Sequence, residues 1–507
     1  MDKLIEEGER VNKQKSCQIS RREFFWRTAG LSAGVFLSGS ELIWAREYAK
    51  VFNWKKYAGS GSAVVKGSVR GRVVSRGKGI KGVRCSDGYK VVVTDQDGGF
   101  SIDAIDSSGG YVFVVTPQGY WTDRFYVSSA EAVKRQVEFE LEPMDLGDKY
   151  TAVYLPDVHL ESGEQENTRK RFGATLDELN GMAERPALAI GGGDICLANN
   201  AGAQYVEMMS RLQMPVRNGL GNHELLVGQA DPRGSFNNLF GPSYHSFDYG
   251  RVHYVVMDGC LYVPHRRGHD IEGWVSPTEL AWLENDLRLV PKDMPTVVVI
   301  HIPLMSTFPA RYGMSAQDAA LSVIRDCCRE EVIGVLKKYN VPLVLQGHAH
   351  ENERIFLGSI EFVESISVCG SWWQARKGRE NGVSGEPRGY RLLEVNDTRI
   401  VHRYVSSAES RVEEPGEFVN LRDGKLVSGK ELVVNFFDAS NEAEVSGRVA
   451  GGSWIPWEPA RMGSYKLKVH HWKSPEGFLG SGEQEVEVRC RDRGRAEEQL
   501  VGRLQIG

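Results

Sequence analysis

Five short, largely apolar runs in the middle of the chain each end in a small polar cluster. The runs are TAVYLPDVHL, RPALAIGGGDIC, MPVRNGLGNHE, TVVVIHIPL and VPLVLQGHAH. Such runs predict buried strands, and the helical segments between them, such as SPTELAWLENDLRLV, predict an α/β fold. In that helix Ser276 is the expected N-cap, with Glu279 three residues later. The alternation extends from Tyr150 to about Ser367.

The polar clusters bring histidines and carboxylates to the expected strand ends. Alternate side chains of extended backbone point to the same side, so His348 and His350 would share one side of the chain, as would Asp157 and His159. Taken alone, a pair of alternate histidines is better explained by two ordinary core or surface histidines. The other clusters contribute Asp194, Asn222, His223 and His301. Five of the twelve histidines thus fall in these clusters, which favours one common site.

In chain order the clusters form the series D-x-H, G-D, G-N-H-E, H and G-H-x-H. Over roughly residues 149–370 this series resembles that of the calcineurin-like metallophosphoesterase superfamily. The resemblance implies a four-layer α/β/β/α core with the site at the strand ends. The flanking segments resemble the N-terminal and C-terminal β domains that accompany some bacterial members of the superfamily.

The resemblance also implies a site for two divalent metal ions. One ion would be held by Asp157, His159 and His350, and the other by Asn222, His301 and His348, with Asp194 bridging both. His223 would not be a ligand. It would face the phosphate and act as a general acid.

The charges of these residue types suit an anionic substrate. Two divalent ions bring positive charge that the two carboxylates neutralise only in part, which leaves a net charge of about +2. A bridging hydroxide would attack a bound phosphate in line, and the mixed oxygen and nitrogen ligands favour Mn, Fe or Zn over Ca or Mg. We therefore expect hydrolysis of a phosphomonoester or phosphodiester, either a small molecule or a component of the cell envelope. The alternative is a catalytically retired envelope binding protein that acts through its β modules.

Residues beside the clusters narrow the choice of subfamily. GDICLANN lacks the tyrosine expected in purple acid phosphatases and the D-R-G expected in serine/threonine protein phosphatases. DVHL and GNHE are closer to the bacterial group that holds cyclic-nucleotide phosphodiesterases and general phosphatases. Glu224 is expected to bond backbone rather than metal, and Cys196 to serve packing. Trp372 and Trp373 are expected in an inter-domain core.

Composition shifts divide the chain into four parts. Short valine-rich runs with turn signals between them predict an N-terminal β-sandwich over residues 60–145. The catalytic domain is expected over 146–370, and glycine- and valine-rich runs predict a β-rich domain over 371–507. Residues 1–49 are expected to be an export signal and leader.

The leader prediction rests on paired arginines before an apolar run. Arg21 and Arg22 precede Phe24 and Phe25, followed by a modestly apolar stretch and small residues. This pattern resembles a twin-arginine export signal and predicts a location in the periplasm or cell envelope. The alternatives are a short membrane anchor and a reading frame whose start is wrongly assigned. We expect no transmembrane span in the mature chain, because the run falls short of the roughly 20 apolar residues needed.

Neither charge nor cysteine content favours a nucleic-acid partner or a disulfide framework. The net charge of -5 and the pI of about 6.2 show no basic excess that would indicate a nucleic-acid partner. The eight cysteines show no regular spacing and no C-x-x-C pair, so we expect mostly buried free thiols rather than a disulfide framework. The adjacent Cys327 and Cys328 are not expected to form a disulfide with each other.

Overall fold

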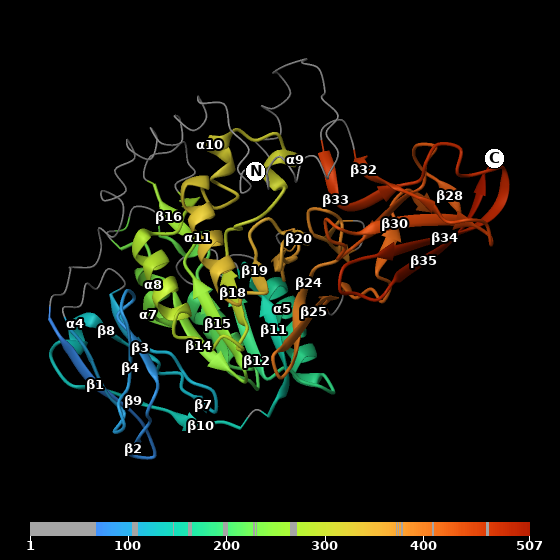
Figure 1. Ribbon diagram of the computed structural model, residues 1–507. Coiled ribbons are helices and arrows are strands. Elements are labelled where there is room, and N and C mark those ends of the chain that lie inside the picture. The colour runs from blue at the N-terminus through green and yellow to red at the C-terminus, as the bar shows by residue number, and fades with distance from the viewer. Residues whose placement is uncertain are drawn as a thin grey trace. The chain divides into compact units, whose positions relative to one another are not determined.

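A computed structural model represents the 507-residue chain (Figure 1). It describes residues 67–103, 110–145, 147–160, 165–195, 201–226, 229, 231–263, 271–371, 373, 375–376, 379–407, 410–462 and 466–506. The expected leader, Cys196, His265, His269 and Trp372 lie outside the described residues.

The N-terminal module contains two four-stranded sheets, as its valine-rich runs predict. In the first sheet β2 (Lys78–Gly79), β1 (Val69–Ser75) and β5 (Gly99–Ile102) are neighbours, and β9 (Val137–Glu140) pairs with β1. The second sheet has the order β4 (Val91–Val93), β3 (Arg84–Ser86), β6 (Tyr111–Val114), β8 (Tyr126–Ser128). Helix α4 (Ser129–Ala132) and the pair β7 (Tyr120–Trp121) and β10 (Glu142–Pro143) complete the module.

Two sheets form the catalytic core. The first has the order β13 (Val216–Gly219), β12 (Leu188–Gly192), β11 (Lys149–Leu155), β24 (Gly389–Asn396), β25 (Arg399–Ser406). The second has the order β14 (His245–Tyr249), β15 (Val252–Met257), β18 (Thr296–Ile300), β19 (Leu343–Gln346), β21 (Ile360–Glu364), β20 (Glu353–Leu357). Strands β11, β12 and β13 are parallel to one another, as are β15, β18, β19 and β21.

The apolar runs are buried because side chains of the two sheets share one hydrophobic cluster. Tyr154 and Ile190 from the first sheet and Val256, Val299 and Leu345 from the second are at most 1% exposed and belong to this cluster. Parallel strands that are covered on both faces are expected to be apolar throughout, and all five residues of β18 are buried. The five predicted strands correspond to β11, β12, β13, β18 and β19.

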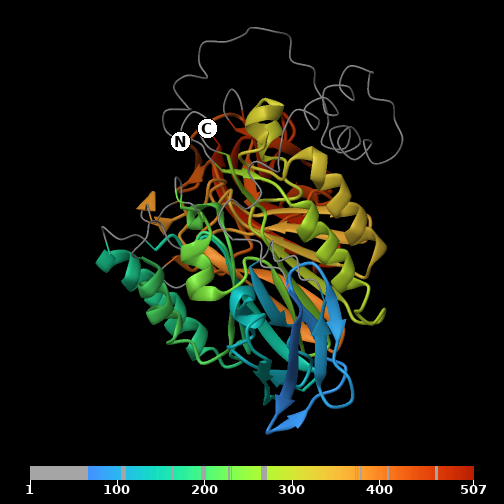
Figure 2. The ribbon, with the colours of Figure 1, turned by 90° about the vertical axis from the view of Figure 1, so that its left-hand side faces the viewer.

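The catalytic core also contains helices. They are α5 (Gln165–Gly181), α6 (Ala201–Met209), α7 (Gly234–Phe240), α8 (Pro277–Leu287), α9 (Phe308–Arg311), α10 (Ala316–Ala319) and α11 (Asp326–Lys338). Figure 2 shows α5 on one side of the strands and α8 and α11 on the other, as the expected α/β/β/α layering requires. Ser276 caps α8 as predicted, because its hydroxyl accepts a hydrogen bond from the backbone N–H of Glu279 at 3.1 Å.

The core sheet continues beyond residue 370, where the sequence-based domain boundary lies. Strand β24 pairs antiparallel with β11, from Lys149 opposite Asn396 to Tyr154 opposite Arg391, and β25 pairs with β24. These two strands therefore belong to the catalytic core, although their composition resembles that of the module that follows. The hairpins β16 (Cys260–Tyr262) with β17 (Ile271–Gly273), and β22 (Ala375–Arg376) with β23 (Arg379–Glu380), lie outside both core sheets.

The C-terminal module is β-rich, as predicted. One four-stranded sheet has the order β26 (Gly416–Phe418), β29 (Val433–Phe436), β33 (Lys466–Lys473), β32 (Glu458–Met462). The other has the order β31 (Ile455–Pro456), β30 (Glu444–Val449), β34 (Gly482–Arg491), β35 (Glu498–Ile506), and β27 (Leu421–Arg422) pairs with β28 (Lys425–Leu426). Both sheets contribute to one apolar cluster that includes Phe436, Trp472 and Val488.

The described thiols are free, as expected. Cys85, Cys260, Cys328, Cys369 and Cys490 are buried, and Cys327 is exposed. In the part of the chain that the structure describes, no helix has both the length and the apolar character needed to cross a membrane.

A buried network of four charged groups joins the N-terminal module to the core. The imidazole of His253 lies between two carboxylates, with Nδ1 at 2.7 Å from Asp248 and Nε2 at 2.8 Å from Asp286. Arg84 of β3 donates to Asp248 at 2.6 Å. Burial disfavours the charged imidazole, but Asp286 and Asp248 outweigh that effect and raise the pKa of His253. Two carboxylates are thus balanced by one guanidinium and one imidazolium.

We expect His253→Gln to destabilise the protein by roughly 3 kcal/mol, because removing one member of a buried charge network leaves another without its partner. The raised pKa of His253 determines how its contribution to stability depends on pH. The stabilisation by His253 is complete below the unfolded-state pKa of about 6.5 and is lost as pH rises through the higher folded-state value. Urea denaturation at pH 6 and pH 9 should show a larger wild-type advantage at pH 6.

His245→Gln provides the matched control for this experiment. His245 is also buried, but burial lowers its pKa to about 3, so it is neutral throughout the tested range. Its replacement should change stability equally at both pH values. A wild-type advantage over His253→Gln that grows toward pH 9 would contradict the charged assignment of His253.

Candidate metal centre

The eight residues predicted from the five clusters come together at the ends of the core strands. Asp157 and His159 follow β11, Asp194 follows β12, Asn222 and His223 follow β13, His301 follows β18, and His348 and His350 follow β19. The Nε2 atoms of His159 and His350 are 2.9 Å apart. The Nε2 atom of His301 lies 3.1 Å from both Asp194 Oδ2 and Asn222 Oδ1. The structure therefore makes one site of five separate segments.

The backbone at the site differs from the extended conformation expected from the sequence. Asp157, His159, His348 and His350 have φ of 53°, 45°, 82° and 57°. Each is left-handed and lies just past the end of its strand. Non-glycine residues rarely adopt this region unless the surrounding structure holds them there. The side chains converge because of these turns and not because of strand alternation.

Glycines allow the close approach of the clusters. A Cβ atom on Gly193 would lie 2.8 Å from the imidazole of His301, and one on Gly347 would lie 2.6 Å from the Asp157 carboxylate. Both glycines stand directly before a site residue, at strand ends where no side chain fits.

Asp194 lies at the centre of the site. Its Oδ2 atom is 3.7 Å from His159 Nε2 and 3.1 Å from His301 Nε2. Burial alone would raise the pKa of Asp194, but the nearby imidazoles of His301 and His223 outweigh it and hold the pKa well below its usual range. The carboxylate is therefore ionised and faces both groups of histidines.

Glu224 holds the backbone around Asp194, as predicted for a carboxylate that bonds backbone. One of its oxygens accepts hydrogen bonds from the N–H groups of Asp194 and Gly221 at 2.9 and 2.7 Å. The other accepts from Ile195 at 2.9 Å. Because both oxygens are engaged in this way, Glu224 joins the loops after β12 and β13.

His223 lies in a short 3-10 helix, η3 (Asn222–Glu224), rather than in the extended segment expected from the sequence. Its backbone N–H donates to Asp194 Oδ1 at 2.8 Å. Its side chain is 34% exposed, and Nε2 lies 3.8 Å from Asp194 Oδ2. The ring therefore faces the centre of the site from its solvent side, which is the expected direction.

Backbone carbonyls orient three of the imidazoles. Nδ1 of His301 lies 3.0 Å from the Gly192 carbonyl, and Nδ1 of His350 lies 2.8 Å from the Gly370 carbonyl. For His348 the contact is between Nε2 and the Leu321 carbonyl, at 2.8 Å. A carbonyl can only accept, so each of these nitrogens carries a proton, and in the neutral form of each ring the other nitrogen has a lone pair for a cation.

Titration of the imidazoles also suits cation binding. Burial lowers the pKa of His348 to about 4 and that of His159 well below its usual value, so both are neutral. Burial opposes charge on His301 as well, but Asp194 and Asp157 raise its pKa to about 9. Protonated His301 carries its second proton on Nε2. A cation bound at Nε2 would displace this proton, so metal binding should weaken as pH falls.

Among the residues that the structure describes, three groups of potential ligand atoms lie close enough to hold a metal ion. They are His159, Asp194 and His223; Asp194, His301 and His348; and His159, His350 and Cys369. Buried carboxylate oxygens and neutral imidazole nitrogens that converge from several segments fit a divalent transition metal. Asp157, whose Oδ1 lies 3.5 Å from His350 Nε2, and Asn222 complete the donor set.

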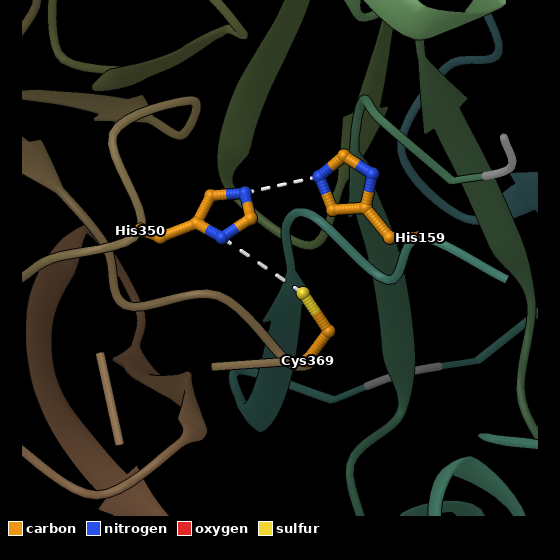
Figure 3. A group of neighbouring side chains, drawn as sticks. All are labelled: His159, His350 and Cys369. Carbon is orange, nitrogen blue, oxygen red and sulfur yellow. Dashed lines mark hydrogen bonds between the residues drawn. The ribbon is translucent and has the colours of Figure 1, made fainter. Parts of the chain in front are cut away.

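Sequence reasoning did not find the roles of Cys369 and Trp373. Figure 3 shows the imidazole of His350 between His159 and the thiol of Cys369, with a separate ring nitrogen facing each. Trp373 is 7% exposed, as expected for a core residue, but its indole N–H donates to the carbonyls of Val158 and His159 at 3.0 and 3.3 Å. Neither residue belongs to a sequence motif, so only the structure reveals these contacts.

Three family models match successive parts of the chain. Residues 151–352 match the calcineurin-like phosphoesterase model. Residues 67–144 and 364–476 match the models for the N-terminal and C-terminal parts of calcineurin-like phosphoesterases. The chain belongs to the calcineurin-like phosphoesterase family. It is accordingly a metal-dependent phosphoric ester hydrolase with the mixed α/β fold of that family, and the clustered histidines and aspartates provide its candidate metal ligands.

Two curated relatives of this phosphoesterase differ in their reactions. A 3′,5′-cyclic-nucleotide phosphodiesterase of Nostoc sp. is 24% identical over 256 residues, which cover 48% of this chain and 86% of the relative. Purple acid phosphatase 23 of Arabidopsis thaliana is 25% identical over 277 residues, which cover 45% of this chain and only 53% of the relative. The two identities are nearly equal, so similarity does not separate the two classes, even though GDICLANN lacks the expected tyrosine.

Among solved structures, the purple acid phosphatase PPD1 of yellow lupin (Lupinus luteus) matches with a TM-score of 0.37 and 14% identity. The match covers 64% of this chain and 57% of that one. With so low a TM-score, the fold assignment rests on the strand order and on the family match.

Proposed function

We propose that this phosphoesterase uses two divalent metal ions to hydrolyse a phosphomonoester or phosphodiester. The observation that carries the proposal is the convergence, at five strand ends, of eight side chains suited to metal binding or proton transfer. Asp194 supports the proposal of two ions, because one of its oxygens lies close both to His159 and to His301. A single central carboxylate between two histidine groups is the arrangement that a bridging ligand requires.

The residues divide naturally between the two ions. Asp157, His159 and His350 would hold the first ion, because His350 Nε2 lies within 3.5 Å of Asp157 and of His159. Asn222, His301 and His348 would hold the second, and Asp194 would contact both. The imidazole and carboxylate donors favour Mn, Fe or Zn. When bound, such ions would polarise a phosphoryl oxygen and lower the pKa of a coordinated water.

The remaining work of catalysis falls to the chain itself. His223 reaches the site from its solvent side, where a phosphate ester would enter, and can donate a proton to the leaving oxygen. Glu224 joins the loop of Asp194 to η3 by hydrogen bonds. His223 and the Asp194 carboxylate therefore keep a fixed relative position. The carbonyls of Gly192, Leu321 and Gly370 keep the ligand imidazoles in the tautomers that cation binding needs.

Elemental analysis combined with two hydrolysis assays tests the proposal. p-Nitrophenyl phosphate is a monoester and bis(p-nitrophenyl) phosphate is a diester, so the pair also distinguishes the two substrate classes. We expect about two ions per chain and hydrolysis of at least one ester that ends on chelation. A protein that binds no metal and hydrolyses neither ester would instead support the alternative of a retired binding protein.

We also propose that the protein is exported to the periplasm or cell envelope. The support is the pair Arg21 and Arg22 before an apolar run, in a segment that lies outside the described residues. Changing both arginines to lysine should leave the precursor in the cytoplasm, whereas the unchanged protein should begin soon after Ala45 or Ala49. Cell fractionation and N-terminal sequencing provide the measurement. Envelope protein that still begins at Met1 would indicate an uncleaved anchor.

A further inference from the structure

One segment after β21 contacts all three ligands assigned to the first ion. This bracing segment comprises residues 367–371 and Trp373. The N–H of Val368 donates to the Pro156 carbonyl at 3.0 Å, and the N–H of Cys369 donates to that of Asp157 at 3.3 Å. The bracing segment therefore runs alongside the loop that carries Asp157 and His159.

Trp373 fixes the same loop from its other end. Its indole N–H is shared between the carbonyls of Val158 and His159, at 3.0 and 3.3 Å. The backbone N–H of Trp373 donates to the Cys369 carbonyl at 2.8 Å, which closes the bracing segment on itself. Because His159 has a left-handed φ of 45°, these bonds help to hold a backbone conformation that the residue would rarely adopt alone.

The bracing segment also orients His350. The Gly370 carbonyl accepts from Nδ1 of His350 at 2.8 Å and from the Ser367 hydroxyl at 2.6 Å. The thiol of Cys369 lies 3.9 Å from the same nitrogen (Figure 3). These contacts turn Nε2 of His350 toward His159 and Asp157, where the first ion would lie.

The bracing segment is itself firmly held. The fully buried Arg388 donates to the Val368 carbonyl at 3.4 Å and to the Ser407 hydroxyl at 2.8 Å, and its guanidinium carbon lies 5.1 Å from the centre of the Trp373 ring. Arg171 of α5 donates to the Trp373 carbonyl at 2.9 Å. A segment anchored in this way can transmit a fixed geometry to the residues it contacts.

The ligands assigned to the second ion are held by other parts of the chain. His301 contacts the Gly192 carbonyl, His348 contacts the Leu321 carbonyl, and Asn222 lies in η3, which Glu224 joins to the loop after β12. One link between the two ligand sets is the backbone N–H of His348, which donates to the Asp157 carboxylate at 3.0 Å. A change in the bracing segment should therefore affect the first ion more than the second.

We propose that the bracing segment positions the ligands of the first ion and sets the affinity for that ion more than for the second. The proposal rests on the assignment of two ions under Proposed function. Trp373 and Ser367 act here as positioning residues, since they reach the ion only through His159, His350 and the backbone. Changes to such supporting contacts typically lower metal affinity by roughly 10- to 100-fold.

Trp373→Phe tests the proposal through the His159 contact. Phenylalanine keeps an aromatic ring in the buried site but removes the N–H. Competition titration with a chromogenic chelator should show one binding step weakened by roughly 10- to 100-fold and the other weakened much less. Elemental analysis after dialysis should show about one ion per chain, and excess metal should restore hydrolysis. Ser367→Ala removes the hydroxyl that donates to the Gly370 carbonyl and so tests the support of His350 separately. It also provides the test if Trp373→Phe does not fold.

Trp282→Phe is the matched control. Trp282 is fully buried in α8, and its indole nitrogen makes no hydrogen bond within the described residues, so this change loses a similar volume without losing a bond. The two metal-binding steps of Trp282→Phe should match those of the wild type. The proposal is overturned if Trp373→Phe and Ser367→Ala both keep two wild-type steps, weaken both steps equally, or behave as Trp282→Phe does. Fewer than two ions in the wild type would instead overturn the dinuclear assignment itself.

Discussion

Asp194→Asn is expected to lose most of the bound metal and with it nearly all hydrolytic activity. The change removes one negative charge from a position that faces both histidine groups, whose nitrogens lie 3.1 to 3.7 Å from Asp194 Oδ2. A ligand shared by two ions weakens both when it is replaced. The loss should exceed the roughly 10- to 100-fold drop in metal affinity expected for a supporting residue.

The fold should survive this substitution, which makes the metal measurement interpretable. Asp194 has a left-handed φ of 49°, and asparagine tolerates that conformation about as well as aspartate does. The hydrogen bonds that the backbone N–H groups of Asp194, Ile195 and Gly221 donate to Glu224 do not involve the replaced side chain. Loss of the charge next to His301 should lower the midpoint of the metal-free variant, so thermal denaturation should confirm that it is still folded at the temperature of the metal measurement.

Asn222→Ala provides the comparison, because it removes a neutral ligand from one ion only. Elemental analysis after dialysis should show fewer ions in Asp194→Asn than in Asn222→Ala. About two ions per chain in Asp194→Asn would rule out the bridging role of Asp194.

The core strands and the site residues could be predicted from the sequence because both have local signals. An apolar run such as TVVVI predicts a buried strand by itself, and the polar residue that follows it, His301, needs no distant partner to be noticed. The recurrence of that pattern five times indicated one candidate site. The positions of Glu224 and of the Ser276 cap were predictable for the same reason.

Contacts between distant segments had no local signal in the sequence. Trp373 is 214 residues from His159, with which it shares a hydrogen bond, and neither its neighbours nor its spacing indicates that contact. Strand β24 has the composition of the following β module, and only its pairing with β11 places it in the core. The left-handed turns at Asp157 and His350 were missed because the strand period was extended past the strand ends. Local propensity cannot predict strain that tertiary packing imposes.

His223→Ala should retain close to the wild-type metal content while kcat falls by roughly 10²- to 10⁴-fold, the range usual for loss of a general acid. The imidazole nitrogen lies 3.8 Å from Asp194 Oδ2, too far for a hydrogen bond, and the bond from the His223 backbone N–H to Asp194 persists in alanine. A group that acts only in the transition state changes the rate and leaves ground-state binding largely unaltered. Steady-state kinetics and elemental analysis on the same preparation provide the measurement.

The geometry also allows the opposite assignment, because His223 lies with His159 and Asp194 in a group that could hold a metal ion. If His223 is a ligand, His223→Ala should lose metal, and excess metal should recover part of the rate. If it is the general acid, added metal should have no effect, and the loss should shrink for esters whose leaving groups need no proton. A series of aryl phosphates of decreasing leaving-group pKa therefore separates the two roles. Full activity of the variant on the poorest leaving group would exclude the general acid.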